Sequence, residues 1–260
     1  MVQKSCLMYL MERFLLLSLS VIGVFIGTMS GFFGIGGGMI LVPILLLLGF
    51  DIKDAIGISI IQMVFSSLYG SYLNYKKGSL LIKEGIYIGL GGFIGGYIGA
   101  YVTQFLSDEI LHFLFFGILL FALFRLLFSP LYEEEHNYKN LNQMLLFIIG
   151  VSIGIFSITL GIGGSIILTP LLVGLLHYPL KKAVSAGLFF VVFSSMAGFI
   201  SRLSTGSIDF EHGFIVAFAS LLGVVLGIYF KEKINTRHHK IALLCLYLFA
   251  LGLLVQRNLL

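Results

Sequence analysis

A glycine-rich motif occurs twice in this chain at a fixed spacing. The run Gly34-Ile35-Gly36-Gly37-Gly38, followed by Pro43, returns 127 residues later as Gly161-Ile162-Gly163-Gly164-Ser165, followed by Pro170. Further along, the spacing becomes 128 residues and persists in the pairs Ala55 and Ala183, Ser66-Ser67 and Ser194-Ser195, Gly95 and Gly223, and Gly99 and Gly227. Two related apolar halves with a glycine interruption at the same place are typical of secondary transporters, and the interruptions mark the expected substrate site.

The composition is that of a membrane protein. Hydrophobic residues make up 58% of the chain and charged residues only 11%, whereas a soluble domain carries about 25% charged residues. A transmembrane helix needs about 20 apolar residues, and most of the charge-free stretches suit one; they are residues 14–50, 55–75, 85–107, 110–124, 140–180, 183–201, 213–230 and 241–256. We therefore predict an all-α polytopic protein that passes several times through the inner cell membrane.

The stretches divide into two homologous halves. We predict a first membrane repeat at residues 1–128, a polar linker at 129–140 and a second repeat at 141–260, each repeat with one long stretch and three ordinary ones. The long stretch at 14–50 would reach about 55 Å as one straight helix, which exceeds the ~30 Å hydrocarbon core. It must therefore break at its glycines. It either crosses once as two offset half-helices or folds back as a hairpin, and the sequence leaves both open.

The positions of lysine and arginine favour the hairpin. If each long stretch returns to its starting side, the halves are inverted, with five Lys and Arg residues on the N-terminal side and eleven on the other. If each long stretch crosses once, the division is nine against seven. Because positive residues concentrate in cytoplasmic loops, the clearer asymmetry predicts inverted halves, with both termini outside and the linker inside.

The glycine motifs are the strongest candidates for a binding site. Each glycine costs nearly ~1 kcal/mol relative to alanine in a helix, and unpaired backbone amides in lipid cost several kcal/mol each. Such a break survives only where it is buried in protein or lines a wet cavity. Its amides and the N-terminus of a short helix starting near Met39 would attract an anion. Pro43 should lie about one turn into that helix, where its missing N–H costs little; Pro170 repeats this design, and Ser165 adds a hydroxyl donor. The alternative is a tight turn between packed helices.

Neutral polar residues within the apolar stretches are further candidates. Ser66 and Ser67 recur as Ser194 and Ser195, and Gln62 lies one turn before the first pair. They would contact substrate or, alternatively, bond helix to helix. Asn74 is expected at the membrane interface. No Asp, Glu, Lys or Arg lies in the middle of a stretch, so we expect neither a carboxylate proton relay nor a buried cation clamp. The four-residue spacing of Gly91, Gly95 and Gly99 predicts close helix packing only.

Enzyme and nucleic-acid functions receive no support. The chain lacks Gly-x-Ser-x-Gly and His-Glu-x-x-His motifs, its four aspartates lie in expected loops, and no Gly-Lys-Ser/Thr follows the glycines. Its two cysteines, Cys6 and Cys245, form neither a disulfide framework nor a metal motif. The net charge of +4 is explained by cytoplasmic Lys and Arg. We expect no enzyme activity, cofactor, metal or nucleic-acid partner.

The motifs resemble those of the sulfite exporter TauE/SafE family, also called the toluene-sulfonate uptake permease family. The resemblance rests on Gly31-Phe-Phe-Gly-Ile-Gly-Gly-Gly-Met-Ile-Leu-Val-Pro43, on Leu160-Gly-Ile-Gly-Gly-Ser-Ile-Ile-Leu-Thr-Pro170, and on Gly206-Ser207-Ile208-Asp209, and it covers about residues 14–257. It implies an inner-membrane permease for a small, often sulfur-containing anion such as sulfite or an organosulfonate. The first half departs from the pattern, with Lys53-Asp54 where the second has Lys181-Lys182.

The leading interpretation is therefore a secondary permease for a small anion. An anion channel and a membrane-embedded assembly component are the alternatives. The partners expected are the anion, the lipid bilayer and a second copy in a homo-oligomer, and the sequence identifies no coupling ion.

The charge asymmetry generates a topology prediction. Reporter fusions should place both termini outside the cell and the linker segment Glu133-Glu134-Glu135 inside. Alkaline phosphatase and green fluorescent protein fusions at each position would measure this, and a cytoplasmic C-terminus would contradict it.

Overall fold

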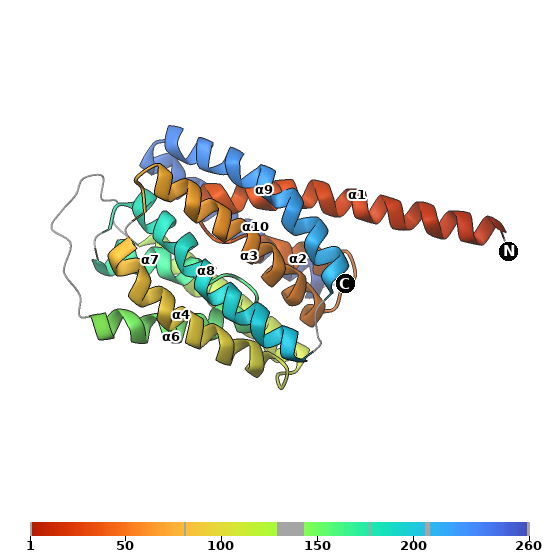
Figure 1. Ribbon diagram of the computed structural model, residues 1–260, viewed down its shortest axis with the longest axis horizontal. Helices are drawn as coiled ribbons and strands as arrows, with labels where there is room; N and C mark the ends of the chain where they lie inside the picture. Colours follow the sequence, from red (N-terminus) through yellow and green to blue (C-terminus); the bar gives the residue numbers. More distant parts are fainter. Residues whose placement is uncertain (1, 81, 129–142, 177, 206–208, 259–260) are drawn as a thin grey trace.

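The computed structural model describes residues 2–80, 82–128, 143–176, 178–205 and 209–258, and the regular elements in these ranges are all helices (Figure 1). In the first half they are α1 (Val2–Phe33), α2 (Gly38–Leu47), α3 (Ile52–Lys76), α4 (Ile82–Thr103) and α5 (Asp108–Leu127). In the second half they are α6 (Gln143–Thr159), α7 (Ser165–Leu176), α8 (Leu180–Thr205), α9 (Phe210–Lys233) and α10 (Thr236–Asn258). The predicted all-α fold is confirmed.

Most of these helices are long and apolar enough to cross a bilayer. In the described ranges, seven qualify by length and composition, and the shorter apolar helices are Gly38–Leu47, Gln143–Thr159 and Ser165–Gly174. The short α2 and α7 each follow a glycine motif, as a broken transmembrane segment requires. The predicted polar linker, with Glu133-Glu134-Glu135, lies outside the described residues.

The first broken segment is a hairpin. The last turns of α1 lie beside the middle of α3, where the Ser30 hydroxyl donates to Ser66 Oγ at 3.4 Å. From there α2 spans only 10 residues, about 15 Å, and ends at Leu47, shortly before α3 begins at Ile52. The chain thus turns back inside the bundle and returns toward the end from which α3 starts. Of the two alternatives left open by the sequence, the structure has the hairpin.

The two halves are arranged in opposite directions. α3 and α8 are equivalent under the 128-residue spacing, and they pack antiparallel: Arg202 donates to the Lys53 carbonyl at one end, and Ser185 donates to Ser79 at the other. Packing across the halves is reciprocal, because α1 lies along α9 while its equivalent α6 lies along α4. The N- and C-termini lie toward the same end of the bundle (Figure 1), as the hairpin arrangement requires.

Glycines allow the closest of these helix contacts. A β-carbon placed on Gly27 of α1 would lie 2.0 Å from the Ser220 carbonyl oxygen of α9. On α4, β-carbons at Gly91, Gly95 and Gly99 would lie 2.1–2.3 Å from backbone oxygens of α6. Both distances are far below van der Waals contact, so the backbones approach as closely as small residues permit. The predicted packing role of these three glycines is confirmed.

This packing generates a stability prediction. Gly27→Ala forces a methyl group into the α9 backbone and should destabilise the protein by about 1–3 kcal/mol. Gly117→Ala on α5 is the matched control, because nothing lies within 4 Å of its β-carbon position; it should be neutral or stabilising by up to ~1 kcal/mol through helix propensity. Thermal unfolding of the detergent-purified variants would measure both, and equal midpoints would refute the close contact.

Candidate functional site

Both glycine motifs form loops that only glycine adopts readily. The first glycine loop, residues 34–37, has φ values of 69°, 76° and 99° at Gly34, Gly36 and Gly37. The second glycine loop, residues 160–164, has φ values of 66°, 82° and 66° at Gly161, Gly163 and Gly164. Side chains with a β-carbon are disfavoured in this left-handed region. Gly38 and Ser165, the remaining motif residues, are the first residues of α2 and α7.

The prolines lie deeper in these helices than expected. Pro43 is the sixth residue of α2, and Pro170 is the sixth residue of α7. A proline beyond the first turn removes a hydrogen bond to the carbonyl four residues earlier. The expectation that their missing N–H groups cost little was therefore wrong: each short helix begins earlier than predicted and carries an internal defect.

The two loops contact each other at the centre of the molecule. A β-carbon on Gly38 would lie 1.9 Å from the Gly161 carbonyl oxygen, and one on Gly163 would lie 2.7 Å from the Ile35 carbonyl oxygen. Ser59 of α3 donates a hydrogen bond of 2.8 Å to the same Gly161 oxygen. The sequence gave no signal for Ser59, because its repeat position is Gly187. The motifs therefore form one site built from both halves.

The N-termini of α2 and α7 both begin at this site. Gly37 occupies the N-cap position of α2, and no side chain in the described ranges caps that end. Gly38 and Ser165 are buried. Because each helix N-terminus carries about half a positive elementary charge, two of them inside the protein create a local positive potential without any charged side chain.

Several polar side chains around the loops have no hydrogen-bond partner among the described residues. Both amide atoms of Gln62 are buried in this condition, and the Oε1 atom would lie 2.6 Å from a β-carbon on Gly37. The hydroxyls of Ser157, Ser165, Thr169 and Ser195 share it. Buried polar atoms normally find a partner in protein or water. Donors left over next to two helix N-termini are a reason to expect a polar ligand there.

The serine pairs divide by partner. Ser66 donates to the Gly36 carbonyl at 3.2 Å and so contacts the first glycine loop. Ser67 and Ser194 each donate at 3.4 Å to the carbonyl three residues earlier in their own helix, which is the helix-bonding alternative. Ser30 and Ser157, which the sequence analysis missed, line the loops as well. Their separation of 127 residues, the same as that of the glycine motifs, was the available signal.

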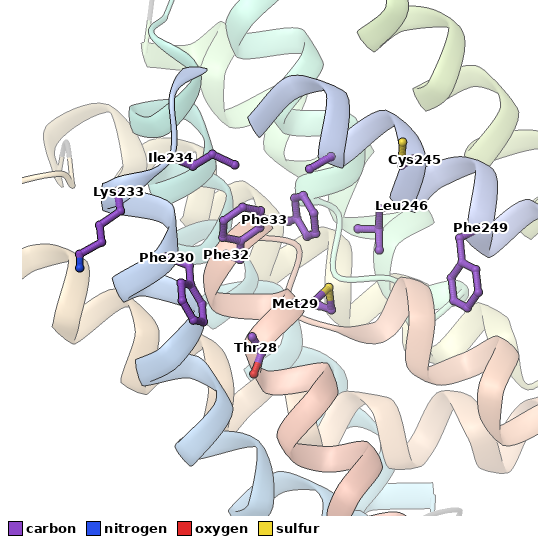
Figure 2. Close-up of a pocket in the computed structure, with 11 residues that line it drawn as sticks. Thr28, Met29, Phe32, Phe33, Phe230, Lys233, Ile234, Cys245, Leu246 and Phe249 are labelled. Atoms are coloured by element: carbon purple, nitrogen blue, oxygen red, sulfur yellow. The ribbon is translucent and has the colours of Figure 1, made fainter. Parts of the chain in front are cut away.

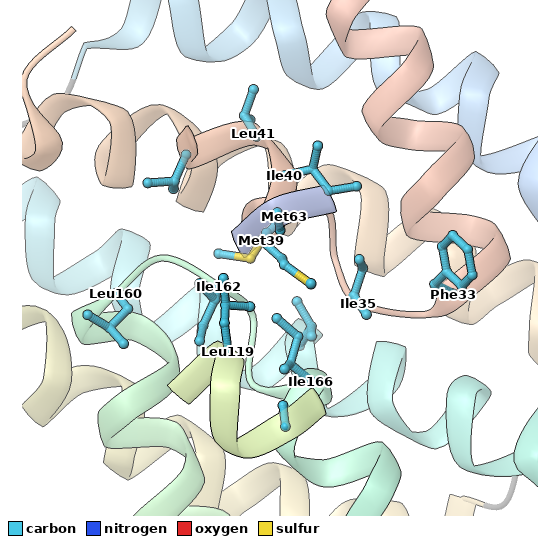
Figure 3. Close-up of a cluster of buried hydrophobic side chains, with 14 of the residues drawn as sticks. Phe33, Ile35, Met39, Ile40, Leu41, Met63, Leu119, Leu160, Ile162 and Ile166 are labelled. Carbon is cyan, nitrogen blue, oxygen red and sulfur yellow. The ribbon is translucent and has the colours of Figure 1, made fainter. Parts of the chain in front are cut away.

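Apolar side chains close the site in this structure. Met63 sulfur would lie 2.9 Å from a β-carbon on Gly163 and 3.4 Å from one on Gly36, so this side chain spans both loops. Val191, its equivalent in α8, would likewise contact both. In Figure 3 the side chains of Met39, Met63 and Ile162 gather at this place. Passage of a substrate therefore requires these helices to move apart.

The buried charges differ from the sequence expectation. Lys231 and Arg202 are 0% and 2% exposed, and Asn74, expected at the interface, is 1% exposed. Among the described side chains no Asp or Glu is buried. The expectation of no buried cation was wrong because both residues lie near helix ends, where their long side chains fold inward between neighbouring helices. One signal was present: Arg202 occupies the repeat position of Asn74.

A large apolar groove lies elsewhere on the molecule. It has a volume of about 750 Å³ and is formed by residues of α1, α9 and α10, among them Met29, Phe33, Phe230 and Leu246 (Figure 2). A smaller apolar hollow between Phe121 and Phe156 involves the repeat-equivalent helices α5, α6 and α7. Their lining suits acyl chains better than a small anion, so neither is the candidate site.

The sequence matches the model of the sulfite exporter TauE/SafE family over residues 19–254. The chain belongs to this family. It is similar to the probable membrane transporter protein YdhB of Bacillus subtilis, with 26% identity over 84% of this chain and 89% of the relative. It is also similar to the probable membrane transporter protein MJ0441 of Methanocaldococcus jannaschii, with 29% identity over 89% of this chain and 92% of the relative. No solved structure gives a significant match. Together with the seven apolar helices, the family shows a multi-pass membrane transporter.

The unpartnered amide of Gln62 generates a prediction that separates function from packing. Gln62→Leu removes two buried polar atoms at similar size, so it should stabilise the fold by about 1–3 kcal/mol while lowering transport at least tenfold. Unfolding midpoints and radiolabelled sulfite uptake into proteoliposomes would measure the two effects.

Ser220→Ala is the control for this test, since the Ser220 hydroxyl is buried and donates within its own helix to Ala217 at 2.7 Å. It should leave transport near the wild-type level. Destabilisation by Gln62→Leu would show that the amide has partners that stabilise the fold. Glycine substitutions are less informative here, because a β-carbon on Gly37 would clash with Ile26 as well as Gln62.

Proposed function

We propose that the protein is a secondary permease for a small anion, and that the two glycine loops contact the substrate. The carrying observation is the meeting of the α2 and α7 N-termini inside the protein. Backbone N–H groups at a helix N-terminus bind anions, and the helix dipole favours negative charge there. Two such ends at one place would complement a monovalent or divalent oxyanion.

The interior charges support an anion over a cation. Lys231 and Arg202 are the Lys and Arg side chains buried in the described residues, and no carboxylate accompanies them there. A transporter of metal ions or amines needs acidic or carbonyl ligands along its path. In this chain the groups left without partners near the loops include the hydroxyls of Ser165 and Thr169, which can donate to an oxyanion.

The family description supports a sulfur-containing substrate. The matched family model is named for sulfite export, whereas the most similar relatives carry the broader name of probable membrane transporters. We therefore propose a sulfite-like oxyanion or an organosulfonate as the substrate class. Alternating exposure would come from movement of the helices that Met63 and Val191 now hold together.

Transport by purified protein tests this proposal. Proteoliposomes should take up radiolabelled sulfite, sulfate, thiosulfate or an organosulfonate saturably, with competition among them, and should show no saturable uptake of choline or a divalent metal. The physical reason is the positive potential of the two helix ends. Saturable cation transport without competition by anions would contradict the proposal, and unitary currents far above carrier rates would indicate an anion channel instead.

A further inference from the structure

A second polar cluster lies at one end of the α3/α8 interface, away from the glycine loops. Lys231 of α9 reaches this interface and is 0% exposed. Its ammonium donates to Asn74 Oδ1 of α3 at 2.6 Å and to Ser185 Oγ of α8 at 2.9 Å. Ser185 in turn donates to Ser79 at 3.2 Å. A buried cation is thus held by neutral groups from the two central helices.

The charge of Lys231 has no close counter-ion among the described residues. Glu232 Oε1 lies 3.7 Å from the ammonium nitrogen, beyond hydrogen-bond distance, on a side chain that is 40% exposed. An ammonium has three donor positions, and two are used by Asn74 and Ser185. Burial of a charge is costly unless it is paired, so the third donor and the uncompensated charge favour an anion at this position.

The neighbouring polar atoms are donors as well. Because an ammonium only donates, the amide oxygen of Asn74 must face Lys231, and the Nδ2 group of the same buried amide is left without a partner. Ser71, one turn earlier on α3, has a buried hydroxyl in the same condition. Three unused donors therefore gather at the end of α3, with no unsatisfied acceptor required of the ligand.

A pocket leads toward this cluster. It has a volume of about 300 Å³ and is lined by Ser71 of α3 and Phe189 of α8, together with aromatic side chains that include Tyr72 and Tyr75. Asn74 and Ser185 lie one turn further along the same two helices. The opposite end of the α3/α8 interface carries the buried Arg202, so a cation stands at each end of the pair whose middle contacts the glycine loops.

We propose that Lys231, Asn74 and Ser71 form an anion-binding site at the end of the α3/α8 interface, where a small oxyanion docks before it reaches the glycine loops. The site rests on the proposed anion-permease function and assigns it an entry point. The bound oxyanion accepts hydrogen bonds from the ammonium, the Asn74 Nδ2 group and the Ser71 hydroxyl.

Binding and transport by variants of the full chain test the site. The probes are sodium sulfite, sulfate and thiosulfate, measured by thermal stabilisation of the detergent-purified protein against sodium chloride at equal ionic strength, and by the KM of uptake into proteoliposomes. Lys231→Gln should weaken binding by about tenfold or more, the usual effect of losing a charged hydrogen bond. Lys231→Arg should retain most of the binding, because it keeps the charge.

Two further variants separate binding from folding. Asn74→Asp has the same shape and provides Lys231 with a carboxylate partner, so the protein should remain folded while the anion is repelled and binding is lost. Lys233→Gln is the matched control on the same helix; its exposed ammonium lies 4.3 Å from the Tyr229 ring centre, and binding should be unchanged.

The outcomes distinguish this site from the proposed function. If the wild-type protein transports an anion and Asn74→Asp has unchanged anion binding and KM, the site is wrong and the function stands. If the wild type neither transports nor is stabilised by any of the three anions, both are wrong. A loss confined to Lys231→Gln and Asn74→Asp supports both.

Discussion

Interrupting a helix inside a membrane leaves backbone amides and carbonyls that lipid cannot satisfy, and this constraint organises the whole molecule. Each glycine loop breaks a helix near the middle of the bundle, where an unpaired group costs several kcal/mol. The protein answers by placing each loop against the other, with Gly38 beside the Gly161 carbonyl and Gly163 beside the Ile35 carbonyl. Ser59 and Ser66 then donate to loop carbonyls. Neither half could bury its loop in this way alone.

The reciprocal packing of the halves follows from this arrangement. α1 must lie deep in the bundle to deliver its loop to the centre, and it does so along α9 of the other half, with Gly27 against the Ser220 carbonyl. α6 uses α4 in the same manner. Because apolar burial gives little driving force between helices in lipid, such contacts depend on close backbone approach and interhelical hydrogen bonds. Small residues therefore set the position of the site.

The electrostatic character of the interior is a second consequence. Two helix N-termini bring positive potential to the centre, and Lys231 and Arg202 add buried cations at the ends of the α3/α8 interface, with no buried carboxylate in the described residues. Met63 and Val191 keep the central contact closed and apolar. A methionine can change rotamer at low cost, which suits a position that must both close a site and yield to a passing substrate.

The sequence by itself determined the class of protein and the location of the breaks. Apolar stretches of membrane length are a property of composition, and a run such as Gly34-Ile35-Gly36-Gly37-Gly38 specifies local backbone conformation, so both are encoded in neighbouring residues. The repeated spacing also identified Gln62 and Ser66 as residues to examine, and the structure places both against the first loop. Family membership followed from the same motifs.

Tertiary structure alone decided how the halves meet and which polar groups become buried. The hairpin path of α1 and α2, the contact between the loops, and the contribution of Ser59 depend on residues about 100 positions apart, which no local pattern encodes. Lys231 and Asn74 looked like interfacial residues because each ends an apolar stretch, yet they are buried against each other. Burial near a helix end depends on how neighbouring helices cross, because a long side chain there can reach either water or the interior.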